Sequence, residues 1–235
     1  DQESQKFYEG KIIGDNITNL RHSRLRQFGG TTGHWGGWCK PMDYYNLDNW
    51  DIDFKDLNKY SDDTCEILGI KNDFKKAKLD NNFNQIQFQY SKVRFAKKFK
   101  VHIEKSKLIH LVKNTYATNL IGANGLASQV NIKHNNKNYQ MNSKIFIIGC
   151  GGVENSRFLL WSRNLNNNLI NNKLPIGKYW MTHPWLLGGI GVLKKDKIKG
   201  FIQNKYIDNG GPLHIGTSEN FALNNNLLSG SLYMT

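Results

Sequence analysis

A glycine-rich loop at residues 29–43 carries the residue types best suited to holding a cofactor. Its glycines have no Cβ atoms, so a ligand could come close to the backbone. Its two threonines offer hydroxyl and N–H groups to a phosphate, and a His-Trp pair adds an imidazole and an indole. This mixture suits a flat, polar and partly anionic cofactor, although a purely structural turn is the alternative. The candidate cofactor-binding residues of the loop are Gly29, Gly30, Thr31, Thr32, His34, Trp35, Gly36 and Gly37.

A second candidate lies at residues 144–162, where the apolar run KIFIIG is followed by CGG and then by VENSRFLLWS. A continuous apolar run predicts a strand that is buried on both faces. The segment after it predicts a helix that begins near Val153. Gly151 and Gly152 would let the backbone approach a ligand, and the helix would direct its free N–H groups toward the same place.

The rest of the chain must position these two candidates. Residues 50–70 predict a helix with Asp53 at its start and Gly69 at its end. Residues 99–148 predict a meander of strands joined by Asn- and Gly-containing turns. Residues 184–235 predict short strands of a second sheet.

The chain is strongly basic, with a formal net charge of +13 over 235 residues. Its densest basic stretch, residues 91–107, alternates charged and apolar positions and predicts a strand whose outer face is covered by lysines. A basic protein can bind nucleic acid, but no signature of a nucleic-acid-binding module is present, so we expect no nucleic-acid partner. A non-catalytic binding module that acts through this stretch remains an alternative.

Cysteine and apolar patterns narrow the class of protein further. Cys39, Cys65 and Cys150 show no metal-type spacing with one another or with histidine, so the sequence predicts no metal site. The longest apolar runs, IFIIGCGGV and WLLGGIGVL, are too short for a transmembrane segment. No signal peptide is visible, and localisation stays open between cytoplasm and periplasm.

The loop with its lead-in, RLRQFGGTTGHWGGWCKPMD, resembles the flavin-facing loop of the glucose–methanol–choline family of FAD-dependent oxidoreductases. The resemblance is strongest to a branch with members that oxidise sugars and polyols. Residues 144–162 resemble the βα unit of that family, with Asn155-Ser156 where the standard signature has Thr-Pro. The segments KNTYATNL and LPIGKYWMTHPW resemble two further parts, and all four follow the family's order.

The resemblance implies an α/β fold, with an incomplete FAD-binding Rossmann-like domain and the start of an α+β substrate domain built on an antiparallel sheet. The implied divisions are residues 1–45 for a segment of the FAD domain with the Gly-rich loop, 46–98 for a helical excursion, 99–182 for the meander and βα unit, and 183–235 for the start of the substrate domain.

The implied chemistry is oxidation of an alcohol group of a sugar, polyol or related small molecule to a carbonyl, by hydride transfer to flavin N5. The electron acceptor is not specified. The resemblance makes His34 a flavin contact or, alternatively, a covalent flavin anchor. It places Ala117 against the adenine, and it leaves His183 either structural or on the substrate side.

The same resemblance implies that parts of the enzyme are missing. The GxGxxG turn with its ribose-binding acid is not found, and the sequence stops at LLSGSLYMT, inside a predicted strand. We therefore expect an internal fragment without turnover of its own. No catalytic residue is assigned, because the base histidine of the family is expected beyond residue 235. A flavoprotein of another FAD superfamily is the alternative within enzymes.

Overall fold

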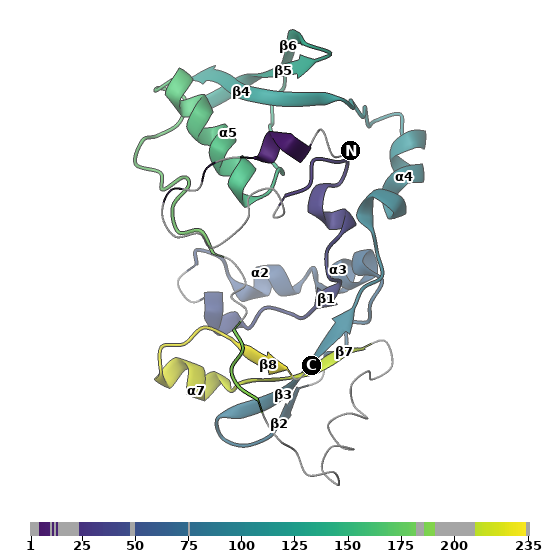
Figure 1. Cartoon of the computed structure of the whole chain (residues 1–235), viewed down its shortest axis with the longest axis vertical. Helices are drawn as coiled ribbons and strands as arrows, with labels where there is room; N and C mark the ends of the chain where they lie inside the picture. Colours follow the sequence, from purple (N-terminus) through teal and green to yellow (C-terminus); the bar gives the residue numbers. More distant parts are fainter. Residues whose placement is uncertain are drawn as a thin grey trace. The chain divides into compact units, whose positions relative to one another are not determined.

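A computed structural model describes residues 5–9, 11, 13, 24–47, 50–74, 76–181, 186–190 and 210–233. The fold is mixed α/β, with antiparallel sheets and few helices (Figure 1). The chain divides into two compact units. Unit 1 is Asp1–Gly30 with Lys100–Gly188, and unit 2 is Thr31–Phe99 with Gly189–Thr235. These divisions fall at 30/31, 99/100 and 188/189. The divisions that the resemblance implies, at 45/46, 98/99 and 182/183, stay a prediction.

Unit 1 is built on an antiparallel meander of three strands, β4 (Thr115–Ala123), β5 (Leu126–His134) and β6 (Lys137–Asn142). The turn after β4 is Asn124-Gly125 and the turn after β5 is Asn135-Asn136, and all four of these residues have positive φ. Asn and Gly tolerate that conformation best, and it matches the twist of a hairpin. The predicted meander is confirmed over residues 115–142, which is only part of the range predicted for it, 99–148.

Helix α5 (Gly152–Leu165) packs against β4 and closes the core of unit 1. Leu120, Phe158 and Leu169 are the buried centre of this core. Ser162 is fully buried beside them. Its Oγ accepts the N–H of Leu120 at 2.9 Å and donates to the carbonyl of Phe158 at 2.8 Å. One hydroxyl thus joins the helix to the strand and satisfies a buried N–H group.

The predicted strand at residues 144–149 is wrong for this structure, which assigns no strand there. Phe146 and Ile148 pack against the core of unit 1, but Ile145 and Ile147 are 76% and 92% exposed. A strand buried on both faces needs neighbouring strands and a second covering layer. Among the described residues only one face of this segment is covered. The apolar run alone was therefore not sufficient to predict a strand buried on both faces.

Unit 2 is built on a sheet of five strands, in the order β1-β3-β7-β8 with β2 also paired to β3. All pairings are antiparallel. The strands predicted near the end of the chain are β7 and β8. They pair with each other, and β7 also pairs with β3. The strands are β1 (Trp38–Cys39), β2 (Lys76–Lys78), β3 (Phe83–Tyr90), β7 (Gly210–Thr217) and β8 (Ser231–Tyr233).

Short helical segments complete the described residues. The 3-10 turns are η1 (Lys6–Tyr8), η2 (Gly30–Gly33) and η3 (Tyr44–Leu47), and a last helix is α7 (Glu219–Asn224). No helix in the described ranges combines the length and the apolar character needed to cross a membrane.

The helix predicted over residues 50–70 is present as two helices, α2 (Phe54–Asn58) and α3 (Ser61–Leu68). Asp53 caps α2 as predicted, because its carboxylate accepts the N–H of Lys55. Gly69 ends α3 in the left-handed conformation, with φ +64°. Tyr60 separates the two helices, since its φ of −100° and ψ of 8° interrupt the helical ladder.

The strand predicted within residues 91–107 is wrong, because the structure has helix α4 (Phe95–Lys105). Phe95, Phe99 and Ile103 recur every four residues, so the same positions fit a helical face and an alternating strand. The rings of Phe95 and Phe99 stack 6.3 Å apart along the helix.

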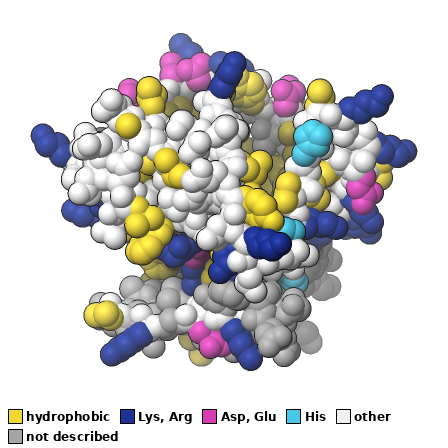
Figure 2. Space-filling view, turned by 90° about the horizontal axis from the view of Figure 1, so that it is seen from above, with side chains coloured by type: hydrophobic (Ala, Val, Ile, Leu, Met, Phe, Trp, Pro, Cys, Tyr) yellow, Lys and Arg dark blue, Asp and Glu magenta, His cyan; other side chains and the backbone are white. Residues whose placement is uncertain are grey.

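The basic side chains of the described residues are interspersed with acidic ones (Figure 2). In Figure 2, Lys and Arg side chains are scattered around the face that is drawn, with Asp and Glu side chains among them. In α4, Lys98 donates to the carbonyl groups of Glu66 and Ile67 at the end of α3. A lysine near a helix C-terminus stabilises the free carbonyls there. This lysine therefore has a structural role.

We expect Ser162→Ala to destabilise the protein by about 1–3 kcal/mol, because it leaves the buried N–H of Leu120 without a partner. Urea denaturation followed by circular dichroism measures the loss. Ser128→Ala is the matched control, because Ser128 is exposed on β5, and its effect should stay within about 0.5 kcal/mol. Equal stability of the two variants would contradict the role of Ser162.

We also expect the stability of unit 2 to fall as the pH drops below about 6.5, the pKa of an unperturbed histidine. Burial lowers the pKa of His214, which lies 4.3 Å from the ring of Phe88 and 3.1 Å from the Ser231 hydroxyl. The unfolded chain therefore binds this proton more readily than the folded chain. This contribution to stability is complete above about pH 6.5 and is lost as the pH falls toward the lowered pKa.

Urea midpoints at about pH 7.5 and about pH 5.5 test this expectation. His214→Gln should reduce the difference between the two midpoints, whereas His110→Gln, which changes an exposed histidine outside any helix or strand, should leave it unchanged. The same pH dependence in both variants would refute the assignment to His214.

Candidate functional site

The turn that precedes α5 is an open, glycine-lined bend. Gly151 caps the helix with φ +85° and ψ 158°, a conformation that L side chains rarely adopt. Asn155 closes the bend, because its side chain accepts the N–H of Cys150 at 2.8 Å and donates to the carbonyl of Ile148 at 3.0 Å. A Cβ atom built at Gly151 or Gly152 would meet no atom within 4 Å. The glycines therefore leave free space beside a helix N-terminus.

An ion pair joins this bend to the segment that leads into the Gly-rich loop. The Arg24 guanidinium donates to the carboxylate of Glu154 in the first turn of α5. Both side chains are largely buried, with 16% and 13% of their surface exposed. Arg157 adds a second positive charge, since its Nε lies 2.7 Å from Glu154. Arg24 also lies over the ring of Tyr8, 4.2 Å from its centroid. The negative charge at the helix start is thus compensated twice.

A second contact ties the same lead-in segment to the start of β4. The guanidinium of Arg26 lies 5.4 Å from the ring centroid of Tyr116, a cation–π distance. Tyr116 precedes Ala117, which is exposed on β4 opposite Ile132. Within unit 1 the structure therefore brings together residues 24–26, the region of Ala117 and the bend at Gly151, which are far apart in the sequence.

The Gly-rich loop itself is divided between the units after Gly30. Gly29 and Gly30 belong to unit 1 and have φ values of +80° and +54°. Thr31 and Thr32 lie in η2 with exposed side chains. His34 is also exposed, and its imidazole forms no hydrogen bond with the described residues. These polar side chains are accessible to a ligand.

The remaining loop residues have structural partners in unit 2. The indole N–H of Trp35 donates to the carbonyl of Val93 at 2.9 Å, and its ring lies 5.9 Å from that of Phe95. A Cβ at Gly37 would lie 2.3 Å from the carbonyl oxygen of Ser91. That serine also donates its N–H to Gly37 at 2.7 Å. Packing alone therefore requires a glycine here, and Gly37 gives no independent indication of a ligand.

Gly36 is less tightly confined, with a hypothetical Cβ 3.1 Å from the Trp38 side chain. The site residues that sequence reasoning missed are Arg24, Arg26 and Asn155. The first two are part of a basic lead-in, RLRQ, whose partners are more than 80 residues away. Asn155 had a local signal, an Asn shortly after a glycine pair at a helix start.

The three cysteines differ in their burial. Cys39 and Cys65 are buried, and burial raises the pKa of both thiols, which keeps them in the unreactive thiol form. Cys150 is exposed in the bend before α5. His183 lies outside the described residues. Within the described ranges no three His, Cys, Asp or Glu side chains are grouped in a way that could hold a metal ion.

The sequence matches no protein family model and no curated protein, and the structure matches no solved structure.

Proposed function

We propose that this chain binds FAD and forms part of an oxidoreductase that oxidises an alcohol group of a sugar, polyol or related molecule to a carbonyl. The proposal combines the resemblance of four collinear segments with the arrangement within unit 1. The bend at Gly151 and the lead-in at residues 24–26 carry the two most specific of those segments, and they are held together by the ion pair between Arg24 and Glu154. This ion pair is the single observation that supports the proposal most.

The residues around the bend suit a dinucleotide. The space beside Gly151 and Gly152 admits a ligand close to the backbone, and the free N–H groups at the start of α5 favour an anionic group such as a pyrophosphate. Glu154 would repel such a group, but Arg24 and Arg157 neutralise its charge. Gly151 and Gly152 would thus hold the pyrophosphate of the cofactor.

FAD would supply the hydride acceptor when bound. The chain's own contribution is binding and alignment, because no base for the alcohol proton is assigned within it. The measurable property is therefore cofactor binding rather than turnover.

A non-catalytic basic binding module is the second class of function. The structure gives it little support, because the basic stretch is a helix in which Lys98 is engaged with α3. Colourless protein that binds polyanions in a salt-dependent manner would favour this class.

Gly151→Ala should weaken FAD binding by about tenfold or more, because its methyl group would project into the space beside the bend. Titration of FAD fluorescence with the purified chain measures the affinity. Gly125→Ala is a closely matched control, because Gly125 also has a positive φ, +77°, and also has nothing within 4 Å of a built Cβ. Both variants strain the backbone, but only the first changes the bend. Equal affinities in the two variants would remove the bend from the FAD site.

His34→Ala should weaken FAD binding or shift the flavin absorbance while changing the free energy of unfolding by no more than about 0.5 kcal/mol, because the side chain is exposed. Absorbance spectra and urea denaturation measure the two effects. Acid precipitation of the FAD-loaded protein tests covalent attachment separately. Flavin in the supernatant would exclude a covalent bond, and an unchanged spectrum in the variant would exclude contact with the flavin.

A further inference from the structure

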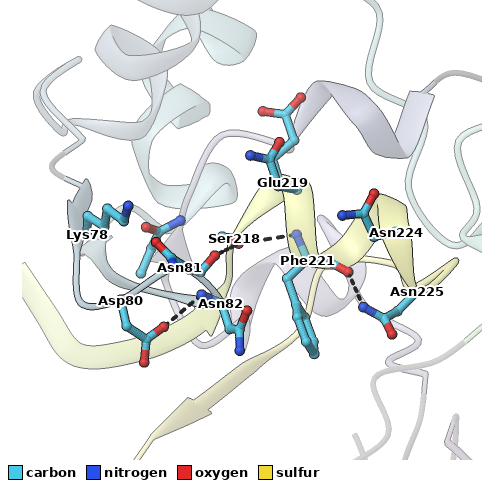
Figure 3. A pocket seen from close by; sticks show the side chains of 11 residues that line it. Lys78, Asp80, Asn81, Asn82, Ser218, Glu219, Phe221, Asn224 and Asn225 are labelled. Carbon is cyan, nitrogen blue, oxygen red and sulfur yellow. Dashed lines mark hydrogen bonds between the residues drawn. The ribbon is translucent and has the colours of Figure 1, made fainter.

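A polar pocket of about 480 Å³ lies in unit 2, between the turn that joins β2 to β3 and helix α7 (Figure 3). Among the described residues that line it, Phe221 alone has an apolar side chain. Amide side chains dominate the lining. They are Asn81, Asn82, Asn84, Asn220, Asn224 and Asn225.

Most of these amides are available to a ligand. Asn225 donates to the carbonyl of Phe221 at 2.8 Å, whereas the side chains of the other five form no hydrogen bond with the described residues. Each free amide offers two donor hydrogens and an acceptor oxygen. The pocket therefore presents donors and acceptors side by side.

The two walls of the pocket are joined by short hydrogen bonds. Ser218 donates its N–H to the carbonyl of Asn82 at 2.7 Å and its hydroxyl to the carbonyl of Asn81 at 2.8 Å. Asp80 fixes the turn, because its Oδ1 accepts the N–H groups of Asn82 and Phe83 at 2.8 and 2.7 Å. The pocket is therefore formed before a ligand arrives, which lowers the entropic cost of binding.

Charge restricts the class of ligand. Lys78 supplies one positive charge to the lining, and Asp80 and Glu219 supply two negative charges. Glu219 already accepts the hydroxyl of Tyr44 at 2.9 Å. The lining is thus slightly negative although the whole chain carries +13, which opposes an anionic ligand. Scarce apolar surface opposes a hydrophobic one.

We propose that this pocket binds a neutral polyhydroxylated molecule of monosaccharide size. A hydroxyl group both donates and accepts a hydrogen bond, so adjacent hydroxyls match the paired donors and acceptors of the free amides. The pocket volume lies within the range of small-molecule sites. This inference does not rest on FAD binding, since every residue that carries it lies at the end of β2, at the start of β3, in the turn between these strands or around α7.

Saturation-transfer NMR on the full chain, with no FAD added, tests the proposal with D-glucose and D-mannitol as a ring and an open-chain ligand and with D-gluconate as their anionic counterpart. We expect transfer to at least one neutral ligand, with a dissociation constant of about 1 mM. Binding of gluconate should be weaker, because its carboxylate faces the net negative lining.

Replacing Asn82 and Asn224 together by alanine should raise that dissociation constant about tenfold, because hydrogen bonds from both walls of the pocket are lost. Asn138→Ala, at an exposed asparagine on β6 in unit 1, should leave it unchanged. The proposal is overturned by absence of transfer to both neutral ligands, by tighter binding of gluconate, or by wild-type affinity in a double variant whose circular dichroism is native. None of these outcomes bears on FAD.

Discussion

The ion pair between Arg24 and Glu154 is the constraint on which the candidate site depends. Both side chains are largely buried, and a charge in such a place is stable only when an opposite charge compensates it. The pair also serves an electrostatic purpose. A carboxylate in the first turn of α5 favours the helix but would oppose a bound anion. With Arg24 and Arg157 beside it, Glu154 can stabilise the first turn of α5 without making the bend repulsive to an anion.

Glycine serves two different purposes in the residues that suggested a cofactor. At Gly37, a Cβ would collide with the carbonyl of Ser91, so the fold of unit 2 requires glycine whatever the protein binds. At Gly151 a Cβ would meet nothing. Internal packing does not require the bare backbone there, although its positive φ favours glycine. The case for a ligand is therefore stronger at the bend before α5 than at the second half of the loop.

Within each unit, hydrogen bonds of buried polar side chains fix the packing of loops and helices. Ser162 connects α5 to β4. In unit 2, Gln89 is buried and its amide bonds to the backbone of Lys71 and Asp73. Ser91 is fully buried and donates to the carbonyl of Leu68. Because an unpaired buried polar group is costly, each such contact specifies one arrangement of its loop or helix.

Features that rest on local chemistry could be predicted from the amino-acid sequence. Asn and Gly turns defined the meander, Asp53 and Gly69 bounded the helical segment, and the glycines before Val153 marked the start of α5. These signals succeed because a turn or a cap depends on the conformational preference of a few adjacent residues.

Features that depend on distant partners became visible only in the folded chain. Residues 95–105 satisfy a helical and an alternating pattern alike, and packing selected the helix. The run at residues 144–149 is covered on one face only, which its composition could not reveal. Arg24 finds its carboxylate 130 residues along the chain. Long-range pairing depends on which segments the fold brings together, and no local pattern carries that information.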